Sequence, residues 1–158
     1  MLSTTLLCSM GAALFLLFSS CSKENKSAAQ GADKLPSDFR LVFGEGGGFT
    51  GMWQGYTIDS SGAIYSWQGK LAGENPRSAG KLSATQIKAL WQEIQKADLL
   101  GQELNERGNM TSIMRVTANG VTKELAWIPR MDATATAASP PQQVQQYCRK
   151  LVEKTIKK

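Results

Sequence analysis

The residues of this chain that could bind a phosphate stand between Gly44 and Trp53, in the stretch GEGGGFTGMW. Gly46, Gly48 and Gly51 have the G-x-G-x-x-G spacing with which dinucleotide-binding proteins hold a pyrophosphate. That use requires a helix to begin at the last glycine, because the helix N-terminus supplies the N–H donors and the dipole that bind the anion. The residues after Gly51 are MWQGYTI, which is typical of a strand. The sequence therefore predicts no nucleotide at these glycines.

Side chains for acid–base, nucleophilic or metal chemistry are scarce. The chain has no histidine, which excludes histidine-based catalytic triads and the usual zinc sites. Cys148 has no imidazole to activate it and is expected to be a small buried helix residue. The 13 acidic residues are scattered without visible pairing. We therefore expect no catalytic residue, cofactor, metal or nucleic acid, and we predict that the protein is not an enzyme.

The glycine-rich stretch carries bulky side chains that suit contact with another protein. Glycine residues flank Phe49 and Thr50 and lead into Met52 and Trp53. Exposed aromatic residues on flexible loops are typical of binding sites, so these four are the candidate partner-binding residues. The alternative is a glycine-rich bend whose Phe49 folds back onto the protein core.

The N-terminal residues predict export and tethering to a membrane. The first 20 residues carry no charge, and the apolar run Leu6–Phe18 is shorter than the roughly 18 residues that span a bilayer, which is typical of a signal peptide. The run ends in LFSSC at Cys21, before polar sequence begins. This resembles the lipobox of bacterial lipoproteins, although Phe18 stands where that pattern usually has leucine. An uncleaved N-terminal anchor is the alternative.

The lipobox resemblance implies a division of the chain into three parts. Residues 1–20 are the signal peptide, residues 21–37 are the lipidated cysteine and a flexible tether, and residues 38–158 are one domain. Lipidation of Cys21, with palmitate as one of the acyl chains, would attach the protein stably to a membrane. Ser22, where sorting signals for the inner membrane have aspartate, implies the outer membrane if the organism has one. The predicted location is thus the cell envelope.

The rest of the chain predicts a single α+β domain with the order β-β-β-α-β-β-α, a mostly antiparallel sheet of about five strands with two packed helices. Alternating apolar residues predict the strands, and Asp59-Ser60-Ser61-Gly62 predicts a hairpin turn between the second and third. Gly69–Gly80 is expected to be a long loop. The strands are expected at Phe39–Phe43, Trp53–Ile58, Ala63–Gln68, about Thr111–Ala118, and Val121–Ile128.

An Asn119-Gly120 pair favours a two-residue type I′ turn, which fixes the register of the last two strands. That register sets Met114 opposite Leu125 on the core face and Arg115 opposite Glu124 on the solvent face. Aromatic residues of the preceding hairpin instead fall on both of its faces. Either helices cover both faces or one face binds a partner, and we favour coverage. These aromatic residues are Trp53, Tyr56, Tyr65 and Trp67.

Two helices are expected from capping signals and from periodicity. Ser83 and Gln86 form a capping box at the start of the first, and Gly101 fits the residue just past its end. Ser139-Pro140-Pro141-Gln142 starts the second in the same way. The apolar faces are expected to be Ile87, Leu90, Trp91, Ile94 and Ala97 in the first helix, and Val144, Tyr147, Cys148, Leu151 and Val152 in the second.

The layout from Phe39 to Ile128 is similar to that of the emfourin-like family. The shared features are Gly47-Gly48-Phe49-Thr50-Gly51 after a strand, the stretch YTIDSSG, the stretch LSATQIKALWQEIQKADLL and a strand pair that turns at Asn-Gly. Those are small bacterial proteins whose named member inhibits thermolysin-like metalloproteases. This chain departs from them through its lipid anchor, its longer loop before the helix and its additional C-terminal helix.

The resemblance implies a membrane-tethered, non-catalytic envelope lipoprotein that inhibits or captures a secreted protease, extracellular or periplasmic. The alternative is a structural or interaction lipoprotein that binds another component of the cell envelope. An unrecognised hydrolase comes third.

Overall fold

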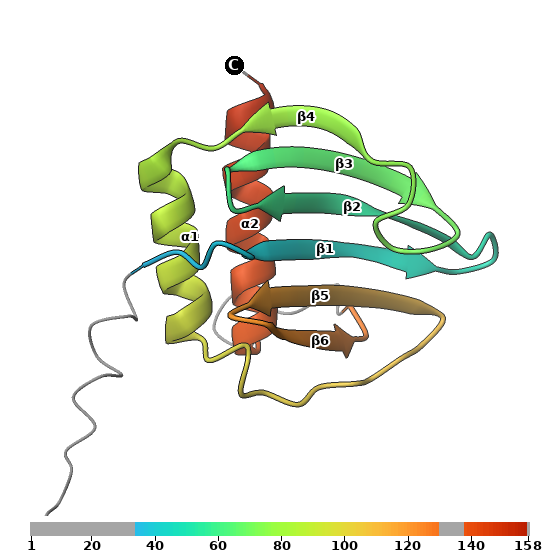
Figure 1. Cartoon of the computed structure of the whole chain (residues 1–158). Helices are drawn as coiled ribbons and strands as arrows, with labels where there is room; N and C mark the ends of the chain where they lie inside the picture. The colour runs from blue at the N-terminus through green and yellow to red at the C-terminus, as the bar shows by residue number, and fades with distance from the viewer. Residues whose placement is uncertain (1–33, 130–137, 158) are drawn as a thin grey trace, which may run out of the picture.

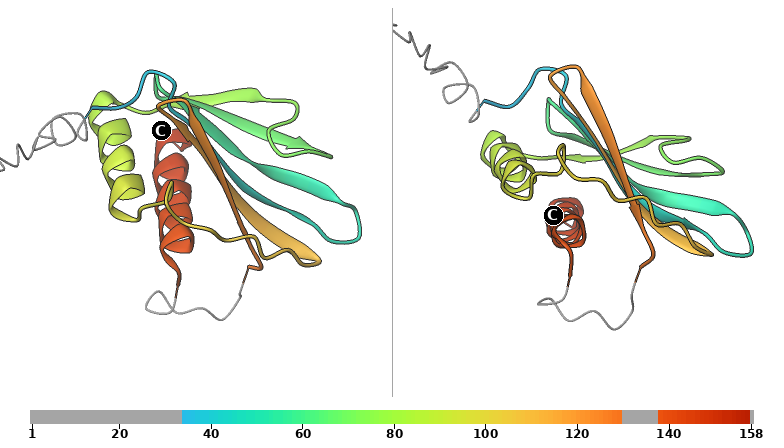
Figure 2. Two further views of the ribbon diagram at one scale, coloured as in Figure 1. Left: turned by 60° about the horizontal axis from the view of Figure 1, so that its bottom comes forward. Right: turned by 90° about the horizontal axis from the view of Figure 1, so that it is seen from below.

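The computed structural model describes residues 34–129 and 138–157 (Figure 1). Six strands form one antiparallel sheet in the order β4-β3-β2-β1-β5-β6. Both helices pack on the same face of this sheet (Figure 2). The predicted α+β class is confirmed, with one strand more than expected. The elements are β1 (Arg40–Gly47), β2 (Met52–Asp59), β3 (Ala63–Gly69), β4 (Arg77–Lys81), α1 (Ala84–Lys96), β5 (Met110–Ala118), β6 (Val121–Trp127) and α2 (Pro140–Ile156).

Both predicted hairpin turns form. Gly62 has a φ of +83° and donates its N–H to the carbonyl of Asp59 at 2.9 Å, which closes the β2–β3 turn. Asn119 and Gly120 both have positive φ, as a type I′ turn requires. Met114 therefore lies opposite Leu125 as predicted, and both side chains are buried in the core.

The solvent face of the β5–β6 hairpin carries the predicted charge pair. Arg115 lies opposite Glu124 and donates two hydrogen bonds to it, and Arg107 donates a third at 2.8 Å. Partial burial alone would raise the pKa of Glu124, but the hydrogen bonds and charges of Arg115 and Arg107 outweigh that effect and lower the pKa. The carboxylate is thus held in its charged form by structural contacts.

The sequence reasoning missed β4 and shortened β1. The predicted loop Gly69–Gly80 contains most of β4, yet Arg77–Lys81 pairs with β3 along the edge of the sheet. The pairing shifts register between Ile64 and Tyr65, and the strand has no alternation of apolar and polar residues that could have revealed it. β1 continues through Gly44–Gly47, because these three glycines and Glu45 pair with β2 and β5 on either side.

Helix α1 begins as predicted and ends differently. Ser83 and Gln86 form the full capping box. At the other end, the left-handed residue is Asp98, with a φ of +48°, and not Gly101. The N–H of Asp98 bonds to the carbonyl of Gln95 and that of Leu99 to the carbonyl of Ile94, which is the Schellman pattern. Aspartate tolerates this conformation. The prediction that Gly101 is the residue just past the end of this helix was therefore wrong.

Helix α2 also begins at the predicted residue, with two prolines in its first turn. Gln142 accepts the backbone N–H of Ser139 at 2.9 Å, whereas the Ser139 hydroxyl makes no hydrogen bond to any part of the chain that the structure describes. Val144, Cys148 and Val152 are buried against the sheet, as their spacing predicted. Within the same ranges, no helix is both long enough and apolar enough to cross a membrane.

The face of the sheet away from the helices has its own buried row. Trp67, Gly55, Gly44 and Ile113 lie side by side across four strands. A Cβ on Gly44 would lie 2.7 Å from the Trp67 ring and one on Gly55 would lie 2.6 Å from it, so the indole lies flat across both glycines. Trp67 is buried although both helices lie on the other face.

The prediction that helices cover both faces of the β2–β3 hairpin was therefore wrong. Tyr56 lies on the helix side, with its ring 5.9 Å from that of Phe43. Trp53, Tyr65 and Trp67 share the opposite face, where two of them stay half-buried.

Each edge of the sheet has a distinct structure. β4 is five residues long and follows Pro76. On the other side, the segment Leu104–Glu106 runs beside β6: Ala126 donates its N–H to Leu104 and accepts one from Glu106, both at 2.9 Å. Glu103, just before this segment, adds an ion pair with Lys123 of β6 at 3.5 Å.

Asp38 links the start of β1 to the β5–β6 turn. Because the link uses a carboxylate, we expect its contribution to the free energy of unfolding to be lost in acid. Its carboxylate accepts the N–H groups of Gly120 at 2.6 Å and Asn119 at 2.8 Å. The bond from Gly120, and then that from Asn119, lowers the pKa of Asp38 below its ordinary 3.8. The stabilisation is present above pH 3.8 and is lost as the pH falls through the lowered pKa.

We therefore expect Asp38→Asn to lower the midpoint of urea unfolding at neutral pH. The gap between the wild type and Asp38→Asn should narrow progressively below pH 3.8. A gap of constant size from about pH 6 to about pH 2 would show that the charge of Asp38 contributes nothing.

Candidate partner-binding site

The sheet extends beyond the helices at the end that carries the β1–β2 hairpin (Figures 1 and 2). We call the helix-side surface of this extension the overhang; it is lined by Glu45, Met52, Gln54 and Gln68. Gln54 and Gln68 are exposed, and the other two are half-buried. The overhang results from the position of α2, which crosses the sheet nearer the other end of the strands.

The tip of the β1–β2 hairpin is a four-residue loop, Gly48–Gly51, with a fixed backbone. Gly51 donates its N–H to Gly48 at 3.2 Å, and the Lys70 ammonium donates to the carbonyl of Thr50 at 2.8 Å. Gly48 also donates its N–H to Asn109, beside the start of β5. Neighbouring segments on both sides therefore hold the tip in place.

Glycine is required at the base of this tip. Gly47 has a φ of +106°, and a Cβ there would lie 2.2 Å from the carbonyl oxygen of Asn109. The following Gly48 also has a positive φ, of +65°. The glycines thus shape a hairpin and bring it against β5. Gly51 leads directly into β2, so the helix start that phosphate binding would need is not present there.

The four residues predicted to bind a partner lie together. Phe49, Thr50, Met52 and Trp53 all line a hollow of about 440 Å³ at the tip. Phe49 is fully exposed, at 107% of the reference value for phenylalanine, so it does not fold back onto the core. Trp53 and Met52 are half-buried, and the Trp53 ring lies against Gly46.

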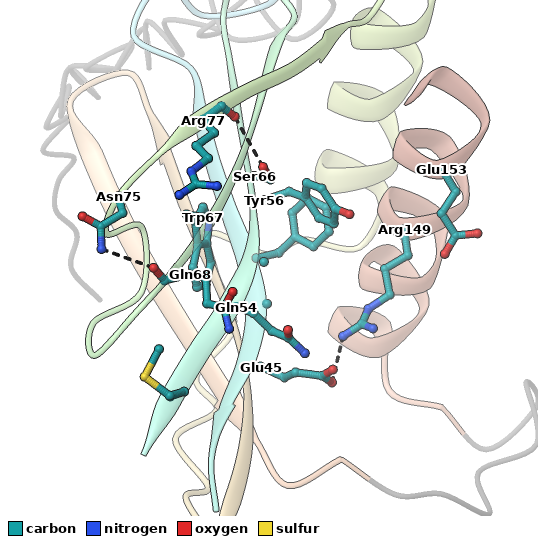
Figure 3. A pocket seen from close by; sticks show the side chains of 14 residues that line it. Glu45, Gln54, Tyr56, Ser66, Trp67, Gln68, Asn75, Arg77, Arg149 and Glu153 are labelled. Atoms are coloured by element: carbon teal, nitrogen blue, oxygen red, sulfur yellow. Dashed lines mark hydrogen bonds and ion pairs between the residues drawn. The ribbon is translucent and has the colours of Figure 1, made fainter. Parts of the chain in front are cut away.

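A second and larger hollow, of about 640 Å³, continues from the overhang to α2 (Figure 3). Arg149 of α2 donates to Glu45 of β1 at 2.9 Å, and this ion pair joins helix and sheet. Glu153 lies one turn further along α2. Arg77 and Asn75 lie on the opposite side of the hollow, beside β3 and β4.

Several polar groups of the larger hollow are free to bind a ligand. The Arg77 guanidinium and the Gln54 amide make no hydrogen bond or ion pair with residues 34–129 or 138–157. The main-chain carbonyls of Gln68 and Arg77 are engaged, by Asn75 at 3.3 Å and by the Ser66 hydroxyl at 3.5 Å. Donors and acceptors spread along an open groove suit the main chain of an extended peptide.

Sequence reasoning did not find the residues of this larger hollow. Gln54 and Gln68 are polar residues at positions that continue the core-facing rows of β2 and β3, which include Ile58 and Ile64. That break in the pattern could have shown that these strands leave the core before they end. Arg77 falls in the predicted loop Gly69–Gly80 and Arg149 in the second predicted helix, and neither position carries a comparable signal.

Metal binding and thiol chemistry find no support among the described residues. Within the described ranges, no group of three or more acidic, cysteine or histidine side chains could hold a metal. Cys148 is fully buried, and burial raises the pKa of its thiol, so the thiolate is disfavoured. The predicted lipidation residue, Cys21, lies outside the described residues. Leu35, within the predicted tether, packs against the core.

Comparison with models of known protein families and with curated proteins finds no match to this chain. The resemblance to the emfourin-like family therefore remains a prediction.

Proposed function

We propose that this protein is a lipid-anchored, non-catalytic envelope protein that binds a secreted protease through the tip of its β1–β2 hairpin, and so inhibits or captures it. The observation that carries this proposal is the fully exposed Phe49 on a backbone held from two sides. A large aromatic side chain in water contributes little to folding, whereas in a partner's pocket it is a typical hot spot.

The hydrogen-bonded backbone of the tip supports specific binding rather than non-specific adhesion. Association costs free energy when flexible groups must be ordered, and a loop that is already ordered avoids part of that cost. The hydrogen bonds from Gly48 to Asn109 and from Lys70 to Thr50 hold the main chain on either side of Phe49 before any partner arrives. A protease subsite that accepts an aromatic side chain is a pocket of suitable shape.

The overhang supplies the polar part of the proposed contact. An extended segment of the partner that passes the tip would meet the amides of Gln54 and Gln68 and then the guanidinium of Arg77. Side-chain amides can satisfy both the N–H and the C=O groups of a peptide. The alternative function, binding another component of the cell envelope, uses the same surface and differs in the partner.

The test is the substitution Phe49→Ala, measured against a thermolysin-like metalloprotease. We expect the parent protein to inhibit cleavage of a fluorogenic peptide, and the inhibition constant to rise by about 30-fold or more in Phe49→Ala, the range of hot-spot truncations. The free energy of unfolding should change by no more than about 0.5 kcal/mol, because the side chain is exposed.

Val121→Ala is the matched control. Val121 is another exposed apolar residue, 53% exposed, but it lies at the opposite end of the sheet from the tip. It should leave both inhibition and stability unchanged. If the parent does not inhibit the protease, but retains a protein from envelope extract that Phe49→Ala fails to retain, the alternative function is favoured. Equal binding by the parent and Phe49→Ala in both assays would refute the role of the tip.

A further inference from the structure

A third hollow, of about 740 Å³, lies at the end of the sheet opposite the hairpin tip. We call it the lysine hollow, because Lys34, Lys81 and Lys88 are its only charged lining residues among those described. All three are exposed, and none makes an ion pair with a residue in the described ranges. The walls between them are formed by Leu35, Leu82, Ala84, Ile87 and the Ser60–Ser61 turn.

The surroundings of the lysine hollow offset only part of its charge. The nearest acidic residue in the β2–β3 turn is Asp59, whose carboxylate accepts hydrogen bonds from the N–H and hydroxyl of Ser61 and from the N–H of Ala63. The first turn of α1, which borders the hollow at Ala84, contains no acidic residue. Three ammonium groups around one hollow therefore favour an anionic ligand.

The position of the lysine hollow indicates which anion it meets. Lys34 is the first described residue, 13 positions after Cys21. The Ser60–Ser61 turn lies at the end of β2 that pairs with the start of β1, whereas Phe49 lies beyond the other end of both strands. The hollow thus faces the anchored end of the chain, about 25 Å from the tip at the usual rise per strand residue.

We propose that the lysine hollow rests on a surface of anionic phospholipid, with headgroup phosphates between the three lysines. Each lysine close to such a surface adds a modest attraction, and three that act together orient a tethered domain. The inference uses the lipid tether of the proposed function to bring the domain to the membrane, and it does not depend on which partner the tip binds.

The test is amine footprinting of the full lipidated protein in vesicles. The protein is incorporated into vesicles of phosphatidylcholine alone or of phosphatidylcholine with about one-third phosphatidylglycerol, and flotation confirms its attachment. An amine-reactive reagent is then added, and mass spectrometry follows each lysine. We expect Lys34, Lys81 and Lys88 to react about 5-fold more slowly on the anionic vesicles, the factor that corresponds to the attraction per lysine.

Lys70, Lys96 and Lys150 are the internal control, because they are three exposed lysines that do not line the lysine hollow. Their rates should not differ between the two kinds of vesicle. Equal slowing of both sets would show a general attraction and overturn the proposal, as would equal rates of the first set on both vesicles.

Two further outcomes separate the remaining explanations. If inorganic phosphate at about 10 mM protects the three lysines equally on neutral vesicles, the hollow is a site for a soluble anion and the membrane proposal is overturned. If the protein does not float even with anionic vesicles, both the tether and the lysine hollow are refuted. Protein that floats without selective protection refutes the lysine hollow alone and leaves the tether in place.

Discussion

Replacing Trp91 with alanine is expected to lower the free energy of unfolding by about 3–5 kcal/mol. Trp91 is 3% exposed in the middle of α1, and its ring packs edge-on against Phe39 at a centroid distance of 5.7 Å. Its indole nitrogen makes no hydrogen bond to the rest of the described chain, so the loss is one of packing and the cavity that remains. Urea unfolding followed by circular dichroism measures the change.

Gln92→Ala is the control for the Trp91 substitution. Gln92 is the next residue of α1 and is exposed, so its truncation should change the free energy of unfolding by less than about 0.5 kcal/mol. A loss below about 1 kcal/mol for Trp91→Ala would mean that this face of α1 is in contact with water.

Gly44→Val is expected to lower the free energy of unfolding by about 3 kcal/mol or more. The face of the sheet away from the helices has no room for a side chain at this position. A Cβ at position 44 would lie 2.2 Å from the carbonyl oxygen of Gln54 and 2.7 Å from the Trp67 ring. The strand pairing prevents the first atom from moving, so the Trp67 ring would have to leave its buried position as well. The quantity to measure is again the free energy of unfolding.

Gly80→Ala is the matched control for Gly44→Val. Gly80 also lies in a strand, but the nearest atoms to a Cβ there are 3.7–3.8 Å away, which is ordinary contact. Alanine at this position should therefore change the free energy of unfolding by less than about 0.5 kcal/mol. A small effect at both positions would show that Trp67 does not depend on the two glycines beneath it.

Local signals were enough to predict most of the fold. The Asn119-Gly120 turn alone set the register that pairs Met114 with Leu125, because a two-residue type I′ turn allows one alignment. The capping box at Ser83 likewise fixed the start of α1. Such features depend on residues close together in the sequence, so the sequence encodes them directly.

The rest depended on contacts between distant segments. Gly44–Gly47 has no preference for a strand, and it becomes one because β2 and β5 pair with it on both sides. The same holds for β4 on its edge of the sheet. The four candidate residues, Phe49 among them, were found from composition, whereas the groove beside them exists because α2 covers only part of the sheet. The periodicity of the sequence does not indicate where α2 lies on the sheet.

The two edges of the sheet bear on how copies of this protein would behave if the proposed anchor crowded them on one membrane. An exposed strand edge is a template for pairing with another chain, and confinement to a surface raises the rate of such encounters. Here β4 offers only the five residues Arg77–Lys81, directly after Pro76 and with an irregular register, and Leu104–Glu106 occupies the outer side of β6 at Ala126. Both edges are thereby protected against pairing with another copy of the domain. The exposed Phe49 can then bind a partner without the edge strands also associating.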